Sequence, residues 1–144
     1  MKRQDVREHV FRLLFRVEFT GIDGMEEQLD LYFDAPSDDD DEIDSNFSEA
    51  DNLYIRKKYE GIAGHLDDID RALNEASKGW EISRMGKVEL SVLRLAVYEI
   101  LYDEDIPTGV AIDQAVELAK KYGQDGASAF INGILANIAR LQGT

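Results

Sequence analysis

Apolar residues recur every three or four positions along almost the whole chain outside residues 34–48. This spacing places them on one face of an α-helix. No apolar run alternates with polar residues for long enough to predict a β-strand. The pattern therefore predicts an all-α fold, a compact helical domain of about six to seven helices.

Three helical segments are predicted in the first half of the chain. They cover residues 3–19, about 25–33, and a long stretch that begins after Ser48. Ser48 is a residue type that caps helix amino termini well, because its hydroxyl can accept a hydrogen bond from a backbone N–H of the first turn. Gly61 and Gly64 interrupt the third segment, so we expect that helix to bend or split.

Three strongly patterned helices are predicted in the second half, over residues 87–102, about 110–122 and about 127–141. The first of these is apolar around most of its circumference, which is typical of the most enclosed helix of a bundle. It nevertheless contains Arg94. A buried guanidinium needs a counter-charge, so we expect an ion pair with a carboxylate of this helix or of a neighbouring one.

Two glycines in this half have predicted structural roles. Gly123 follows the second of these helices, where a left-handed cap residue is common. Gly133 lies inside the last helix, where glycine costs about 1 kcal/mol relative to alanine. We therefore expect a close helix contact at Gly133 that compensates for this cost.

The net charge of −14 is unevenly distributed. Residues 34–51 contain nine acidic residues and no basic one, whereas residues 1–16 contain five basic and two acidic residues. A polyanion repels nucleic acid, so any phosphate contact must be made by a local basic surface. We interpret residues 34–48 as a mobile, solvated acidic loop within a single domain spanning residues 1–144.

Membrane insertion and secretion are not predicted. The chain contains no uninterrupted apolar run of about eighteen residues and no amino-terminal apolar segment followed by a small-residue cleavage site. We therefore expect a cytoplasmic protein without a membrane partner.

Catalysis and metal binding have little support in the sequence. The chain has no Cys, which removes thiol catalysis and zinc–thiolate sites. His9 and His65 lie near no nucleophile or second ligand at metal spacing, and we predict both on the surface. The acidic run has no glycine at the sixth position of a calcium loop, which excludes an EF-hand. We expect no enzyme activity, no metal and no cofactor.

The first helix contains a row of cationic and aromatic residues. Arg3, Arg7, Phe11 and Phe15 follow one another at intervals of four. Guanidinium groups can bind phosphates and aromatic rings can stack on bases, which is how single-stranded RNA is commonly bound. The alternative interpretation is a partly exposed helix flank with two buried aromatic rings.

Four segments together resemble one protein family. They are RQDVREHVFRLLF (3–15), VLRLAVYEI (92–100), VAIDQAVELAKKYG (110–123) after Pro107, and FINGIL (130–135). Their sequence, order and spacing resemble the bacterial transcription antitermination factor NusB. The resemblance implies an all-helical fold of two packed sub-bundles and no catalysis. It also implies binding to a boxA-like sequence in nascent ribosomal RNA, together with the small-subunit ribosomal protein NusE, in a complex with RNA polymerase.

The resemblance also implies roles for individual residues. The candidates for RNA contact are Arg3, Arg7, Phe15, Lys120, Lys121 and Phe130. The candidates for contact with NusE are Asp125 and Phe130.

The chain departs from the family pattern in two of these regions. Gln4 and Asp5 stand where the family often has consecutive arginines, and Gly126 stands where it usually has an acid. The basic cluster is therefore thin. An alternative function is a protein-interaction or ribosome-assembly adaptor of the same fold, or a homodimer, with weak or no RNA recognition.

Overall fold

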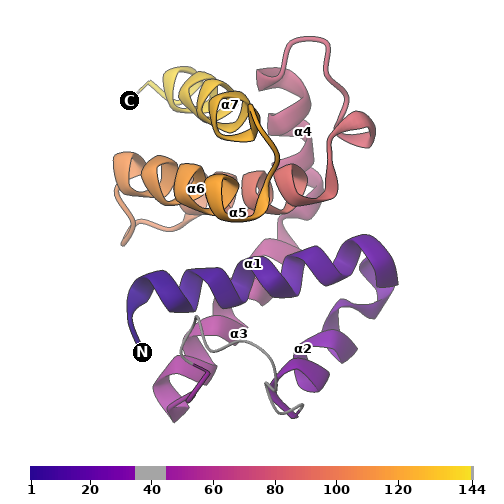
Figure 1. Cartoon of the computed structure of the whole chain (residues 1–144), viewed down its shortest axis with the longest axis vertical. Coiled ribbons are helices and arrows are strands. Elements are labelled where there is room, and N and C mark those ends of the chain that lie inside the picture. Colours follow the sequence, from indigo (N-terminus) through magenta and orange to yellow (C-terminus); the bar gives the residue numbers. More distant parts are fainter. Residues whose placement is uncertain (35–44, 144) are drawn as a thin grey trace. The chain divides into compact units, whose positions relative to one another are not determined.

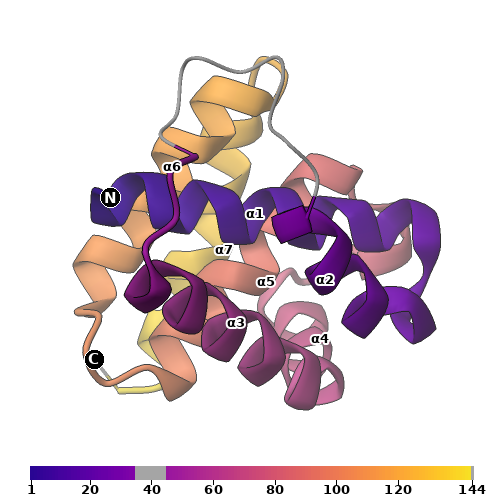
Figure 2. The ribbon, with the colours of Figure 1, turned by 90° about the horizontal axis from the view of Figure 1, so that it is seen from below.

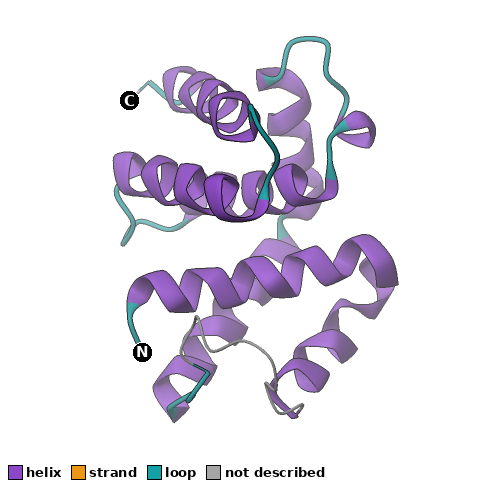
Figure 3. Cartoon of the chain, viewed as in Figure 1, coloured by secondary structure: helices purple, strands orange, loops and turns teal. Residues whose placement is uncertain are grey.

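The computed structural model describes residues 1–34 and 45–143, and every regular element in these residues is helical (Figures 1 and 3). The elements are α1 (Arg3–Thr20), η1 (Ile22–Gly24), α2 (Met25–Asp34), α3 (Glu49–Gly64), α4 (Leu66–Ala76), η2 (Ile82–Arg84), α5 (Lys87–Tyr102), α6 (Thr108–Tyr122) and α7 (Ala127–Leu141). The prediction of an all-α fold is confirmed.

The long third segment is split into α3 and α4, as expected from its glycines. The break falls at His65, whose backbone angles (φ −116°, ψ 15°) leave the helical region. Contacts within the chain divide it at the same place into two compact units, unit 1 (Met1–Ala63) and unit 2 (Gly64–Thr144).

Unit 1 contains α1, α2 and α3. Helix α2 contacts α1, and α3 runs at an angle to α1 (Figure 2). Tyr59 of α3 is 1% exposed, and its hydroxyl donates a hydrogen bond of 3.2 Å to the backbone oxygen of Met25. Burial raises the pKa of Tyr59 to about 12, because the phenolate would lose its hydration, although the positive charge of Arg16 opposes the shift.

Ser48 caps α3 as predicted. Its Oγ accepts a hydrogen bond from the backbone N–H of Asp51, and its own N–H donates to the Asp51 carboxylate, each at 3.0 Å. This reciprocal pair satisfies two backbone N–H groups that the helix itself cannot pair. The hydrogen bonds from Ser48 lower the pKa of Asp51 below its usual 3.8.

Unit 2 contains α4 to α7, with α5 in contact with the other three helices. Helix α5 is the predicted enclosed helix: its residues from Leu90 to Val97 are all buried. Arg94 forms the predicted ion pair, with a partner on α4. Its Nε and Nη2 donate to the two carboxylate oxygens of Asp70 at 3.0 and 2.9 Å.

Both glycine predictions are wrong. Gly123 is extended (φ −89°, ψ 174°), and the left-handed conformation is adopted by Gly126 (φ 87°). A Cβ at Gly123 would lie 2.7 Å from the backbone oxygen of Ala119 and 2.8 Å from the Cβ of Ala127, so glycine is required there by close approach. A Cβ at Gly133 would meet no atom of the described residues within 4 Å, so no close contact there compensates for the cost of glycine.

The prediction of surface histidines is also wrong for His9, which is 1% exposed. Its Nδ1 is hydrogen-bonded to the hydroxyl of Tyr32, and its ring meets Phe47 edge-on at 4.7 Å between centroids. These partners come from segments distant in sequence, so helical spacing did not indicate them. His65 is half-buried, with its ring 4.0 Å from that of Tyr102.

The acidic segment falls largely outside the described residues, which omit 35–44. Asp34 is the last residue of α2, and residues 45–48 precede α3 without regular structure. The predicted mobile loop at residues 34–48 stays a prediction.

Candidate nucleic-acid interface

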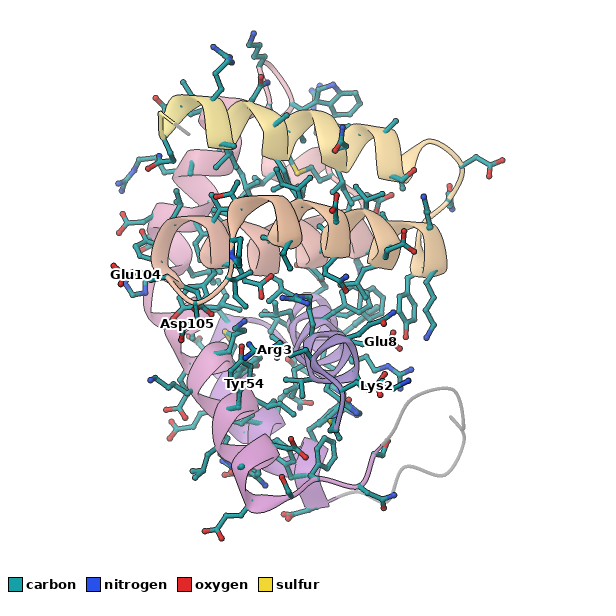
Figure 4. All side chains as sticks on the ribbon, turned by 90° about the vertical axis from the view of Figure 1, so that its left-hand side faces the viewer. Lys2, Arg3, Glu8, Tyr54, Glu104 and Asp105 are labelled. Atoms are coloured by element: carbon teal, nitrogen blue, oxygen red, sulfur yellow. The ribbon has the colours of Figure 1, made fainter. Side chains whose placement is uncertain are left out.

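In unit 1, Arg3 forms an exposed cation–ring pair with Tyr54. Arg3 is the first residue of α1 and Tyr54 lies on α3 (Figure 4). The Arg3 Nη1 donates to the Tyr54 hydroxyl at 3.3 Å, and the guanidinium carbon lies 5.7 Å from the ring centroid. The Nζ of Lys58 lies 5.1 Å from the same centroid. Two cations therefore lie near the ring, of which Lys58 is buried and Arg3 is exposed and accessible to an anionic ligand.

The rest of the predicted row on α1 is less exposed. Arg7 and Phe11 are 6% and 2% exposed, whereas Phe15 is half-buried. Phe15 stands between two rings, with centroids 6.1 Å from Phe11 and 5.3 Å from the exposed Phe19. Of the predicted residues in unit 1, only Arg3 and Phe15 thus present accessible side chains.

In unit 2, Lys120 and Lys121 occupy the last turn of α6 and are both exposed. Cations at a helix carboxyl end are favoured by the partial negative charge of the terminal carbonyl groups. The Lys120 Nζ lies 3.7 Å from Glu117 Oε1, a pair in which both side chains are largely solvated. The Lys121 Nζ lies 5.4 Å from the centroid of Tyr122.

A surface groove of about 600 Å³ runs along the packed pair of helices α6 and α7 next to Lys120. Its lining residues are Asp113, Gln114, Val116, Glu117, Lys120, Ser128, Ala129 and Asn132. Asp125 is exposed in the connection between the two helices. Lys120 therefore lines a groove formed by α6, which carries ELAKK (117–121), and α7, which carries FINGIL (130–135).

Phe130 is half-buried on α7, and its ring contacts a residue that the sequence pattern did not single out, Trp80. The two rings meet edge to face, with 5.8 Å between centroids and 76° between planes. Trp80 lies between α4 and α5 and is 53% exposed. A signal was present in the sequence, since Trp80 is the only tryptophan of the chain and Lys78 and Arg84 lie close to it in sequence.

Other kinds of site are not found in the part of the chain that the structure describes. Within residues 1–34 and 45–143, no group of three or more His, Asp or Glu side chains is placed to hold a metal ion. No helix of the same residues is long and apolar enough to cross a membrane.

The fold and these surfaces define an all-helical protein with exposed clusters of cations and aromatic rings. The NusB family matches residues 4–140. The chain is similar to the transcription antitermination protein NusB of Agathobacter rectalis, with 45% identity over 139 residues that cover 96% of this chain and 100% of the relative. The chain belongs to the NusB family.

Solved structures agree with this assignment. T. maritima NusB superposes with a TM-score of 0.84 at 34% identity, covering 97% of this chain and 92% of its own. The antitermination factors NusB and NusE in complex with dsRNA contain a chain with a TM-score of 0.75 at 24% identity, covering 96% of both chains. At this identity the second match supports the fold alone.

Proposed function

We propose that this NusB-family protein acts in transcription antitermination by binding boxA-like single-stranded RNA of ribosomal RNA transcripts, together with the ribosomal protein NusE. The observation that carries the proposal is the 45% identity, over nearly the full length of both chains, to a relative named as a transcription antitermination protein. The protein acts by binding and not by catalysis, in the cytoplasm, as part of a complex with RNA polymerase.

The exposed cations support RNA binding by a chain that is anionic overall. At −14, the protein repels a polyanion at long range, so association depends on local contacts and on a partner. Arg3 beside Tyr54, and Lys120 with Lys121, are the contacts proposed for phosphates. Phe15 and Phe130 are the rings proposed for bases. The role of Arg7 in RNA binding stays a prediction, because its buried side chain offers little surface to a phosphate.

NusE is proposed to bind near Asp125 and Phe130. Asp125 is exposed in the connection between α6 and α7, the two helices that line the groove, and Phe130 lies on α7. A chain of the same fold has been crystallised as NusB with NusE and dsRNA, which makes NusE the first partner to test. Double-stranded RNA is for the same reason included beside single-stranded RNA in the test.

A titration of labelled RNA by fluorescence anisotropy tests the proposal. The RNAs are a boxA-like single strand, its scrambled counterpart and a duplex, each with and without NusE, at several salt concentrations. We expect tighter binding of the boxA-like strand, a further gain with NusE, and a salt dependence whose slope counts the phosphates engaged. A Lys120→Ala, Lys121→Ala variant should reduce that slope by about 2.

Equal affinity for the boxA-like and scrambled strands, with or without NusE, would contradict specific recognition. Binding of NusE without any RNA binding would favour the adaptor function instead. Sedimentation at micromolar concentration separately tests whether the protein forms a homodimer.

A further inference from the structure

We infer that Trp80 is a base-stacking residue, and that an unpaired base of the RNA lies on its exposed face beside Phe130. This inference rests on the proposed function and adds a residue to it. Trp80 belongs to the connection between α4 and α5, and none of the segments that resemble the family includes it.

The indole is partly exposed and contacts a ring of α7. Its ring meets the half-buried Phe130 of α7 edge to face, which orients the indole, while 53% of the residue stays exposed. An oriented ring with about half of its surface exposed offers a face on which a flat ligand can stack. Rings in this state are the usual platforms for unpaired bases, because every base offers a flat face for stacking.

The backbone that carries Trp80 is itself fixed. Ser77 accepts a hydrogen bond of 3.3 Å from the Trp80 N–H on its backbone oxygen, and its hydroxyl donates to the Trp80 carbonyl oxygen. Lys78 and Gly79 both adopt positive φ, 44° and 97°, to make this turn. A non-glycine residue in that region is strained, so contacts with the rest of the unit must hold the turn in place.

The charge of the segment that carries Trp80 favours RNA as the occupant, because this segment is less acidic than the chain as a whole. Residues 77–87 contain three basic residues, Lys78, Arg84 and Lys87, and one acidic residue, Glu81, in a chain whose net charge is −14. All three basic side chains are exposed. Basic residues close in sequence to a stacking ring are typical of sites for single-stranded nucleic acid, and the acidic residues Glu75 and Glu89 bound this segment.

A shallow pocket of about 460 Å³ beside the indole provides polar groups for the edge of a base. Asn74, Trp80, Glu81, Ile82 and Ser83 line it together with Gly79. The Asn74 side chain accepts a hydrogen bond of 3.2 Å from the Ile82 N–H, which positions its amide at the pocket. Amide and hydroxyl groups next to a stacking ring can read base edges by hydrogen bonding.

The single tryptophan makes the test direct, because indole emission of the full chain reports Trp80 alone. Unlabelled boxA-like RNA is added to the protein with and without NusE, and emission is compared with the anisotropy of labelled RNA. Stacking should quench the indole in parallel with binding. Trp80→Ala should weaken RNA binding about tenfold, and Trp80→Phe should restore part of the loss, since a smaller ring still stacks.

Leu141→Ala is the matched control, because Leu141 is a similarly exposed (54%) apolar residue of unit 2 and no part of the proposed surface. It should change RNA affinity less than about twofold. Far-UV circular dichroism of both alanine variants checks that the helices are retained.

The outcomes separate this inference from the proposed function. RNA binding with unchanged indole emission and undiminished affinity of Trp80→Ala would overturn the inference and leave the proposed function in place. Quenching by NusE alone, with no further change on adding RNA, would assign the ring to the protein partner and overturn it as well. If the unaltered chain binds no RNA under any condition, the proposed function fails and the inference with it.

Discussion

Replacing Arg94 by Met should destabilise unit 2 by about 3 kcal/mol, the lower end of the range for removing one partner of a buried ion pair. The two hydrogen bonds to Asp70, at 3.0 and 2.9 Å, would both be lost. The side chain of Arg94 is 9% exposed and that of Asp70 is 18% exposed, so water reaches the remaining carboxylate only in part. Met retains much of the volume and the helix propensity of Arg, which confines the loss to charge and hydrogen bonding.

Urea unfolding measures this loss. Far-UV circular dichroism follows the helices and Trp80 emission follows unit 2, since the only tryptophan lies there. Arg71→Met is the matched control, because Arg71 forms a pair of the same length, 3.0 Å, with Asp68, but the two side chains are 74% and 56% exposed. Exposed pairs contribute little, so this control should cost less than about 0.5 kcal/mol.

A double replacement tests whether Arg94 and Asp70 stabilise the fold as a pair. Arg94→Met combined with Asp70→Leu also removes the Asp70 carboxylate, so it should recover much of the stability that Arg94→Met alone loses. Two results would refute the assignment of Arg94 and Asp70 as a buried, coupled ion pair. One is an Arg94→Met variant that loses no more unfolding free energy than Arg71→Met. The other is a double variant that is clearly less stable than Arg94→Met alone.

Three further predictions concern the helix ends and the core. Gly133→Ala should raise the free energy of unfolding by about 0.5–1 kcal/mol. Gly123→Ala should lower it by about 1–3 kcal/mol, because the new Cβ would meet neighbours at 2.7 and 2.8 Å. Thermal unfolding of both variants measures the two changes, and changes of the same sign would contradict the prediction. Ser48→Ala should lower it by about 1 kcal/mol through loss of the α3 cap, seen as a lower urea midpoint, and a midpoint equal to that of the unaltered chain would count against the cap. Folding raises the pKa of Tyr59 from 10.0 to about 12, so Tyr59 of the unfolded chain ionises first and the free energy of unfolding should fall as pH rises between these two values. Tyr59→Phe should flatten this part of the plot of unfolding free energy against pH. An unchanged slope would rule out Tyr59 as the cause.

The local pattern of apolar and capping residues was sufficient to predict where helices begin and end. Residues 87–102 and 127–141 are helices with the bounds that apolar spacing predicts, and Ser48 caps the helix that follows it. These features depend on residues within one or two turns of each other, where spacing, propensity and capping act. The need of Arg94 for a carboxylate followed for the same reason, from its place in an apolar helix.

The sequence by itself determined the helical architecture and the resemblance to a protein family, from which the candidate cations and rings were identified. It also determined that an acidic chain needs local positive charge to bind RNA. Only the tertiary structure decided that Asp70 is the partner of Arg94, that His9 is buried, and that Gly123 is required by close approach. It also decided that Trp80 stands against Phe130, fifty positions away in sequence. The physical reason is that these features arise from contacts between elements far apart along the chain, which helical periodicity does not encode.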